Sequence, residues 1–291
     1  MNAIEFGDCR EIMRRWDKER VRAQMCVTSP PYFGLRDYGA EGQIGLEQTP
    51  EEYIAAMVEV FRCVRDVLAD DGTVWLNIGD SYASGGRKTR ANDNKLNQRG
   101  MDIRPTDPDG IKPKDLIGIP WMLAFALRAD GWYLRQDIIW HKPNPMPESV
   151  RDRCTKAHEY VFLLSKSEKY FFDSDAIKEP AAYPPGTRED VKKGGFKSKY
   201  ANDVARKGDE SFRAIREFRN RRSVWSIATR PYKGAHFATF PPALIEPCIL
   251  AGSRPEIWFL IHLSGAGRAP LSLSSMAGNI SGASLTRNTG L

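Results

Sequence analysis

The 291-residue chain has no apolar run that approaches the roughly 20 residues a membrane-spanning helix needs. Residues 1–5 also lack the basic segment followed by an apolar segment that marks a secretory signal. We therefore expect the chain to work in the cytoplasm. Its 41% of hydrophobic residues is typical of a globular protein with a substantial core.

Cysteine and histidine are too few and too scattered for a metal centre or a disulfide framework. The five cysteines include no Cys-x-x-Cys pair, and the four histidines have no ligand spacing. Several cysteines lie in apolar runs. We therefore expect reduced, buried thiols and no structural metal.

Acidic residues are fewer than basic ones, which gives the chain a net charge of +6. The excess is concentrated in residues 181–222, which contain twelve Lys or Arg against six Asp or Glu, with aromatic residues between them. This composition is typical of a surface that faces nucleic-acid phosphates. It is equally typical of a solvated, partly disordered insertion, and composition leaves both interpretations open.

Strand-like and helix-like segments alternate along the chain, and each strand ends in polar residues. The pattern predicts strands at residues 25–27, 73–78, 132–140 and 223–227. It predicts helices at residues 49–68, closed by Asp71 and Gly72, and at 119–127 and 243–251. Segments 158–165 and 169–173 are expected to form a hairpin. We therefore expect an α/β fold whose parallel strands bring polar groups to one edge of a sheet.

The turn Ser29-Pro30-Pro31-Tyr32 follows the first of these strands. Two consecutive prolines fix φ and remove N–H donors, so the carbonyl groups before them are held rigidly beside a hydroxyl and an aromatic ring. Such a turn suits the binding of a planar ring that carries an amino group. The alternative is a proline-terminated strand with a packing tyrosine.

Asp8 is a second candidate, because it follows a short strand and precedes a helix at residues 10–16. In doubly wound sheets a carboxylate at this place contacts the nucleoside of a ligand. A plain helix N-cap explains the same residue, and both roles stay open.

Several segments, in this order, together resemble the amino-methylating DNA methyltransferases whose catalytic motif precedes the cofactor motif. The matching segments are Gly7-Asp8-Cys9, the turn around Ser29 to Tyr32, and residues 76–82, 140–144, 158–162 and 236–241. The resemblance implies an α/β fold with a Rossmann-like S-adenosylmethionine-dependent methyltransferase sheet, a basic target-recognition insertion and an incomplete C-terminal part.

The resemblance also divides the chain. Residues 1–180 would form the catalytic half, with a mobile basic loop at about 85–114. Residues 181–222 would form the target-recognition insertion that contacts double-stranded DNA, and residues 223–255 would supply a strand and a helix on the cofactor side.

The implied reaction moves a methyl group from S-adenosylmethionine to the exocyclic amine of a base flipped out of the duplex. Ser29 and the Pro30 carbonyl would accept hydrogen bonds from that amine. Tyr32, which follows Pro31, would stack on the flipped base. Serine at the first motif position is commoner in cytosine-N4 members. It favours cytosine modestly and leaves adenine N6 open.

For the cofactor, the resemblance implies contacts at both of its ends. Asp8 and Cys9 would contact the adenosine part of S-adenosylmethionine. The residues expected at its methionine end are His236, Thr239, Phe240 and Pro241.

Acidic residues are absent from residues 257–291, where the family has a strand ending in Asp-Pro-Phe, a Gly-x-Gly turn and a later acidic residue. Codons for this tail can be chosen so that a second reading frame restores both family motifs. We therefore expect residues 256–291 to be a frameshifted tail with weak or absent cofactor binding. The rival interpretation is a divergent cofactor turn at residues 264–267, after an apolar strand at 257–263.

Three functions follow from these observations and stay open. The first is a site-specific DNA amino-methyltransferase impaired by its tail. The second is a catalytically dead remnant that still binds DNA through its basic residues. The third is a methyltransferase of RNA or protein that uses the same turn.

Overall fold

The computed structural model describes residue 5, residues 7–35, 42–83, 110–181, 217–229 and 241–254, and the backbone of a strand at 260–263. Three expected cofactor residues, His236, Thr239 and Phe240, lie outside the described residues. So do most of the expected basic loop and most of the expected target-recognition insertion.

The chain divides into two compact units, one formed by Met1–Phe172 with Ser223–Leu291 and the other by Asp173–Arg222. The second unit contains a 3-10 helix, Asp175–Ile177, and two short antiparallel strands, β5 (Glu179–Pro180) and β6 (Phe218–Arg219). Glu179 Oε1 accepts hydrogen bonds from Arg219 Nε at 2.9 Å and from Arg222 Nε at 2.8 Å, which ties these two strands together.

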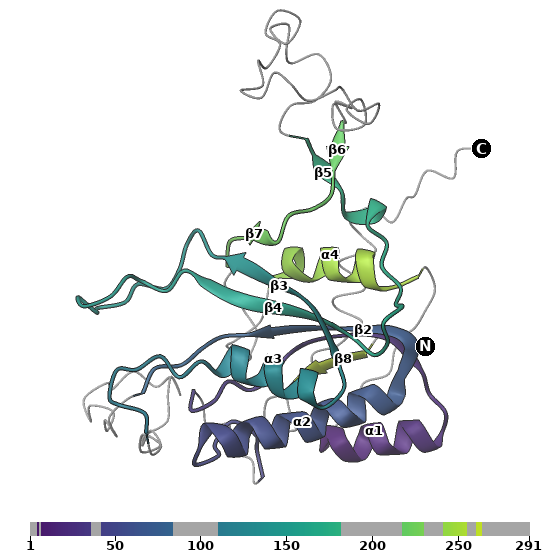
Figure 1. The fold of residues 1–291 in the computed structure, drawn as a ribbon, viewed down its shortest axis with the longest axis horizontal. Coiled ribbons are helices and arrows are strands. Elements are labelled where there is room, and N and C mark those ends of the chain that lie inside the picture. The colour runs from purple at the N-terminus through teal and green to yellow at the C-terminus, as the bar shows by residue number, and fades with distance from the viewer. Residues whose placement is uncertain are drawn as a thin grey trace, which may run out of the picture. The chain divides into compact units, whose positions relative to one another are not determined.

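The first unit is built on a six-stranded sheet of order β7-β3-β4-β2-β1-β8 (Figure 1). Its strands are β1 (Ala23–Ser29), β2 (Leu68–Ile78), β3 (Tyr133–His141), β4 (His158–Ser165), β7 (Val224–Ser226) and β8 (Leu260–Leu263). Strand β1 is parallel to β2 and β8, and β3 is parallel to β7. Strand β4 is antiparallel to both β2 and β3. The sheet is thus parallel except for β4, which confirms the α/β prediction.

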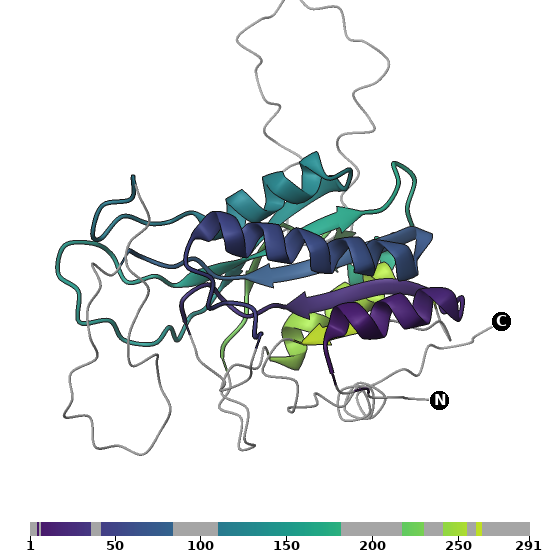
Figure 2. The same cartoon turned by 90° about the horizontal axis from the view of Figure 1, so that it is seen from below.

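Helices cover both faces of this sheet (Figures 1 and 2). On one face lie α1 (Cys9–Lys18), α2 (Pro50–Val67) and α3 (Ile119–Ala129), and on the other lies α4 (Pro242–Gly252). Helix α2 begins with a capping box, in which Thr49 Oγ1 accepts from Glu52 N at 3.2 Å and Glu52 Oε2 accepts from Thr49 N at 3.3 Å. No helix of the described part of the chain is long and apolar enough to cross a membrane.

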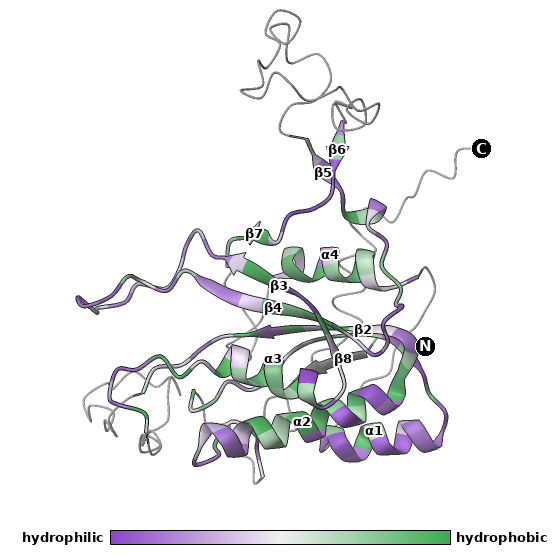
Figure 3. Ribbon diagram, viewed as in Figure 1, coloured by the Kyte–Doolittle hydropathy of each residue, from purple (hydrophilic) through white to green (hydrophobic). Residues whose placement is uncertain are grey.

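The core lies between these layers, and hydrophobic residues gather on β2 and β4 while α1 is largely hydrophilic (Figure 3). Because side chains alternate along a strand, Leu76 of β2 packs with α2 whereas Trp75 faces α4. A Cβ added at Gly252 would lie 2.7 Å from Trp75 Nε1 and 3.1 Å from Met25 Cε. Glycine at this helix end therefore permits close packing of α4 on the sheet.

Two predicted elements are wrong. Residues 169–173 form no strand, because β2 and β3 occupy both edges of β4 and leave no edge for a hairpin partner. Asp71 and Gly72 do not close a helix, because α2 ends at Val67 and β2 begins at the next residue. Gly72 instead allows close strand packing, since a Cβ there would lie 2.8 Å from the backbone oxygen of Gln24.

The cysteines follow the prediction in part. None of the five forms a disulfide, and Cys26, Cys63 and Cys248 are buried. Cys154 is exposed, which corrects the expectation of buried thiols at that position. It lies in the connection between β3 and β4, where polar neighbours provide no core to bury it.

Candidate functional site

The turn Ser29-Pro30-Pro31-Tyr32 lies at the carboxyl end of β1, as predicted. Both prolines are buried, whereas Ser29 and Tyr32 are partly exposed. The buried hydroxyl of Tyr53, on α2, donates a hydrogen bond to the Pro31 carbonyl at 2.7 Å. The turn is therefore fixed from the core side and presents one hydroxyl and one ring.

The ring of Tyr32 packs against the backbone at the end of β2. A Cβ added at Gly79 would lie 2.7 Å from Tyr32 Cε2, so only glycine leaves room for the ring. The Tyr32 hydroxyl donates to Glu159 Oε2 at 2.8 Å and accepts from Ser29 Oγ at 3.4 Å. Burial, followed by the negative charge of Glu159, raises the pKa of Tyr32 well above its ordinary value.

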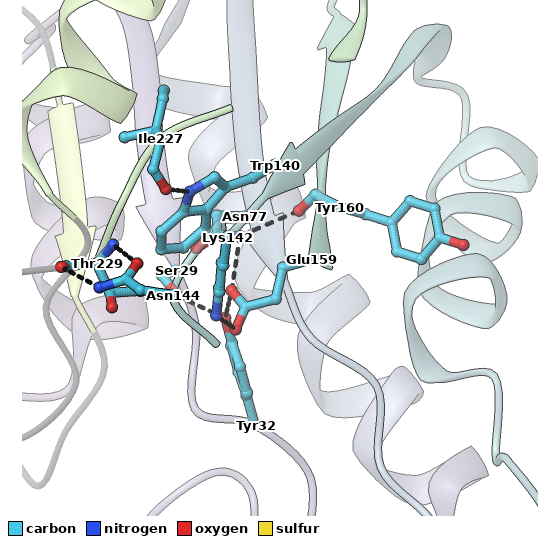
Figure 4. Close-up of polar contacts among 10 residues, drawn as sticks. All are labelled: Ser29, Tyr32, Asn77, Trp140, Lys142, Asn144, Glu159, Tyr160, Ile227 and Thr229. Atoms are coloured by element: carbon cyan, nitrogen blue, oxygen red, sulfur yellow. Dashed lines mark hydrogen bonds and ion pairs between the residues drawn. The ribbon is translucent and has the colours of Figure 1, made fainter. Parts of the chain in front are cut away.

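Glu159 is the centre of a polar cluster that joins four elements (Figure 4). Asn77, at the end of β2, donates from Nδ2 to Glu159 Oε2 at 3.1 Å and also to the Tyr160 carbonyl at 3.1 Å. Lys142 follows β3 and forms an ion pair with Glu159 Oε1. The two charged side chains are only 19% and 16% exposed, and the Lys142 ammonium lies 4.4 Å from the centre of the Trp140 ring.

Sequence reasoning placed Asn77, Lys142 and Glu159 in matching segments but gave them no role. The sequence did carry a signal for Asn77 and Glu159. Asn77 is a polar residue in an apolar strand, and it is only 3% exposed. Glu159 is a charged residue at the start of a second apolar strand. Buried polar groups need partners, so each could have been expected to meet the other.

Asp80 has a structural role at the same edge. Its Oδ1 accepts hydrogen bonds from Gly118 N at 2.9 Å and Ile119 N at 3.0 Å, which are orphan donors at the start of α3. Ser81 Oγ donates to the Phe33 carbonyl at 3.0 Å. The polar residues that follow β2 thus hold α3 and the turn after Tyr32 in place.

The segment after β7 is tied to the segment after β3. Trp140 Nε1 donates to the Ile227 carbonyl at 2.8 Å. Asn144 pairs with Thr229 in both directions, through Nδ2 to the carbonyl at 3.1 Å and from the Thr229 amide to Oδ1 at 2.9 Å (Figure 4). These contacts fix residues 224–229 beside the carboxyl end of β3.

Asp8 is the N-cap of α1, so the alternative left open by the sequence is present in the structure. Its Oδ1 accepts from the Arg10 amide at 2.8 Å, and its carboxylate pairs with the Arg10 guanidinium at 2.6 Å. These bonds, above all the side-chain bond to Arg10, lower the pKa of Asp8. Burial raises the pKa of the neighbouring Cys9 thiol to about 12, so that thiol is protonated at neutral pH. Their cofactor roles stay predictions.

The remaining expected cofactor residue within the described part is Pro241. It immediately precedes α4 and its carbonyl accepts from Leu244 N at 2.9 Å. On the other side of β1, Leu263 of β8 is the register partner of Ser29. The strand that precedes the expected cofactor turn therefore ends at the same sheet edge as the Ser29 turn.

Comparisons with known proteins agree with this architecture. A family model described as DNA methylase matches residues 23–260. The chain is 53% identical over 264 residues to the type II methyltransferase M.SmaI of Serratia marcescens, covering 91% of this chain and 80% of that protein. It is 49% identical over 261 residues to M.Cfr9I of Citrobacter freundii, covering 90% and 76%.

A solved structure shares the fold. The structure described as PvuII DNA methyltransferase (cytosine-N4-specific) superposes with a TM-score of 0.56 at 15% identity, over 100% of this chain and 89% of that one. This match concerns the fold. The family match and the type II relatives show that the chain belongs to the DNA methylase family of N6 and N4 methyltransferases.

Proposed function

We propose that this chain is built as a site-specific DNA methyltransferase that moves a methyl group from S-adenosylmethionine to the exocyclic amine of a flipped base. Cytosine N4 is favoured over adenine N6 because Ser29 occupies the first motif position. The observation that carries the proposal is the rigid turn at the end of β1, which presents the Ser29 hydroxyl beside a Tyr32 ring anchored to Glu159.

The chemistry asks the protein to localise a lone pair. The exocyclic amine of a base is a poor nucleophile because its lone pair is delocalised into the ring, and hydrogen bonds from its N–H groups to fixed acceptors reduce that delocalisation. Ser29 Oγ and the Pro30 carbonyl are the acceptors we propose. The neighbouring Pro31 carbonyl accepts from the buried Tyr53 hydroxyl on the core side, so we assign the amine to the Pro30 carbonyl.

Tyr32 would hold the flipped base by stacking. Its position is fixed at both ends, by Gly79 against the ring and by Glu159 on the hydroxyl. A ring that is already fixed would lose little freedom when the base arrives, which would favour direct transfer.

The residues we propose for the adenosine end of S-adenosylmethionine are Asp8 and Cys9. Asp8 would accept from the adenosine through its carboxylate, which is 36% exposed. Both of its oxygens accept hydrogen bonds from Arg10, so the adenosine would displace part of that contact. Cys9 lies beside Asp8, and residues 236–241 would line the methionine end. When bound, the cofactor supplies an electrophilic methyl group.

The C-terminal tail lacks acidic residues that a cofactor site needs. Residues 257–291 hold no Asp or Glu to accept from the ribose hydroxyls, and the family match ends at residue 260. We propose that residues 256–291 are translated in a shifted frame. Reading the nucleotide sequence around codon 255 tests this, and the absence of a second frame encoding the two family motifs would remove the proposal.

Methyl transfer to DNA is the deciding experiment. The purified full chain is incubated with plasmid DNA and tritiated S-adenosylmethionine, and the DNA is digested to nucleosides. Labelled N4-methylcytosine is the expected product, and N6-methyladenine would support the alternative target. Ser29→Ala should remove the label, because it removes one of the two acceptors.

A second candidate function, a catalytically dead DNA-binding remnant, is favoured by the acid-free tail. It predicts binding of duplex DNA that weakens with salt, without any labelled base. A gel-shift series on the same preparation separates the two functions.

A further inference from the structure

We infer that Glu159 is a positioning residue, which fixes the direction of the hydrogen bonds in the turn so that Ser29 offers an oxygen lone pair to the target amine. This inference rests on the proposed function, because it concerns the acceptor role of Ser29. Glu159 is far from the turn in sequence and lies in β4, which is antiparallel to β2.

The direction follows from what each group can do. An ionised carboxylate only accepts hydrogen bonds, and its ion pair with Lys142 requires that Glu159 be ionised. The Tyr32 hydroxyl, 2.8 Å away, must therefore donate its proton to Glu159. The Tyr32 oxygen is then an acceptor, and the Ser29 hydroxyl 3.4 Å away directs its proton toward it.

The consequence falls on Ser29. With its proton directed to Tyr32, the Ser29 oxygen faces other neighbours through lone pairs. An amine brought to this oxygen meets an acceptor, as the reaction requires. If these hydrogen bonds ran in the opposite direction, from Tyr32 to Ser29, the Ser29 proton would point at the amine. Two hydrogen-bond donors would then face each other.

Glu159 is placed to orient the Tyr32 hydroxyl. It is not placed to take the proton that the amine loses. Its Oε2 already accepts from Tyr32 and from Asn77 at 3.1 Å, and its Oε1 is held by Lys142. Three donors in a site where the carboxylate is only 16% exposed hold it in one orientation. The carboxylate thereby acts on the base through Tyr32.

Glu159→Gln tests this polarity with little change in size. An amide has one acceptor and one donor side, so it cannot face Lys142 on one side and both Tyr32 and Asn77 on the other without placing a donor against a donor. We expect kcat for methyl transfer to fall by about 10- to 100-fold, with KM for DNA changed by less than about threefold. An unchanged kcat would overturn the inference.

Two further variants separate positioning from general damage. Glu148→Gln is the matched control, since Glu148 lies in the connection between β3 and β4 and pairs with Arg153 at 2.6 Å, outside the cluster. It should leave kcat unchanged. In a Tyr32→Phe background, which lacks the hydroxyl that relays the effect, Glu159→Gln should change kcat by less than about threefold. Full multiplication of the two losses would contradict action through Tyr32.

A spectroscopic readout keeps the inference testable if the chain transfers no methyl group, which would count against the proposed function alone. Tyrosine labelled with ¹³C at Cζ reports hydrogen bonding of its hydroxyl, and the Tyr32 signal is identified by its loss in Tyr32→Phe. We expect Glu159→Gln to shift this signal and Glu148→Gln to leave it in place. A Tyr32 signal that ignores Glu159→Gln would overturn the inference.

Discussion

Replacing Gly79 with alanine tests whether the Tyr32 ring occupies the place described above. The added Cβ would lie 2.7 Å from Tyr32 Cε2, 3.3 Å from Cδ2 and 3.5 Å from Glu159 Cδ. Carbon atoms pack best at about 3.5 to 4.0 Å, so the ring must move by roughly 1 Å. Both the ring and its hydrogen bond to Glu159 are affected by that movement.

Gly79→Ala should lower both the free energy of unfolding and the rate of methyl transfer. Overpacking of this kind typically lowers the free energy of unfolding by about 1 to 3 kcal/mol. Each kcal/mol lowers the melting temperature by about 2 to 4 °C in domains of 150 to 250 residues, and somewhat less in a longer chain. Displacement of a positioning group by about 1 Å lowers turnover by about 100-fold.

Thermal unfolding by circular dichroism measures the first effect without any need for cofactor. The control is the same substitution in a Tyr32→Ala background, where the added methyl group has no ring to displace. There we expect Gly79→Ala to change the free energy of unfolding by less than about 0.5 kcal/mol. An equal cost in both backgrounds would show that the ring does not pack on Gly79.

Three other outcomes are expected. Tyr53→Phe leaves the buried Pro31 carbonyl without its donor and should lower the free energy of unfolding by about 1 to 3 kcal/mol in urea titrations, and no change would refute that contact. The hydrogen bond from Arg254 holds the pKa of Asp71 below its value of about 3.9 in an unfolded chain. Asp71 therefore contributes stability that is fully present above about pH 4 and is lost as the pH falls through its folded pKa. The difference in free energy of unfolding between wild type and Asp71→Asn should shrink between pH 6 and pH 3. A constant difference would contradict the direction of the pKa shift. Isothermal titration of the full chain with S-adenosylmethionine should show weak or absent binding, and an ordinary micromolar affinity would contradict the frameshift proposal.

Elements with local signals were predictable from the sequence. Thr49, Pro50 and Glu52 mark the start of α2 within four residues, and the helix begins at Pro50 as the pattern indicates. The end of β1 was predictable for the same reason, because Pro30 cannot continue a strand ladder. Capping and proline geometry act over a few residues, so the sequence carries them directly.

Features that depend on distant partners were not predictable in the same way. The aromatic pattern at residues 169–173 suits a strand, but strand formation needs a free edge, and the chain fills both edges of β4 with distant strands. The cluster around Glu159 has the same origin. Tyr32 and Glu159 meet only because β1, β2 and β4 are neighbours in the sheet, which no local pattern specifies.

The pairing of β8 with β1 depends on backbone groups. This pairing, from Cys26 opposite Leu260 to Ser29 opposite Leu263, is made by peptide groups that every residue except proline carries. A shifted reading frame for residues 256–291, as we propose, would therefore still allow this strand to add to the sheet. The change would then fall on the side chains that meet the cofactor and leave the backbone ladder beside Ser29 in place.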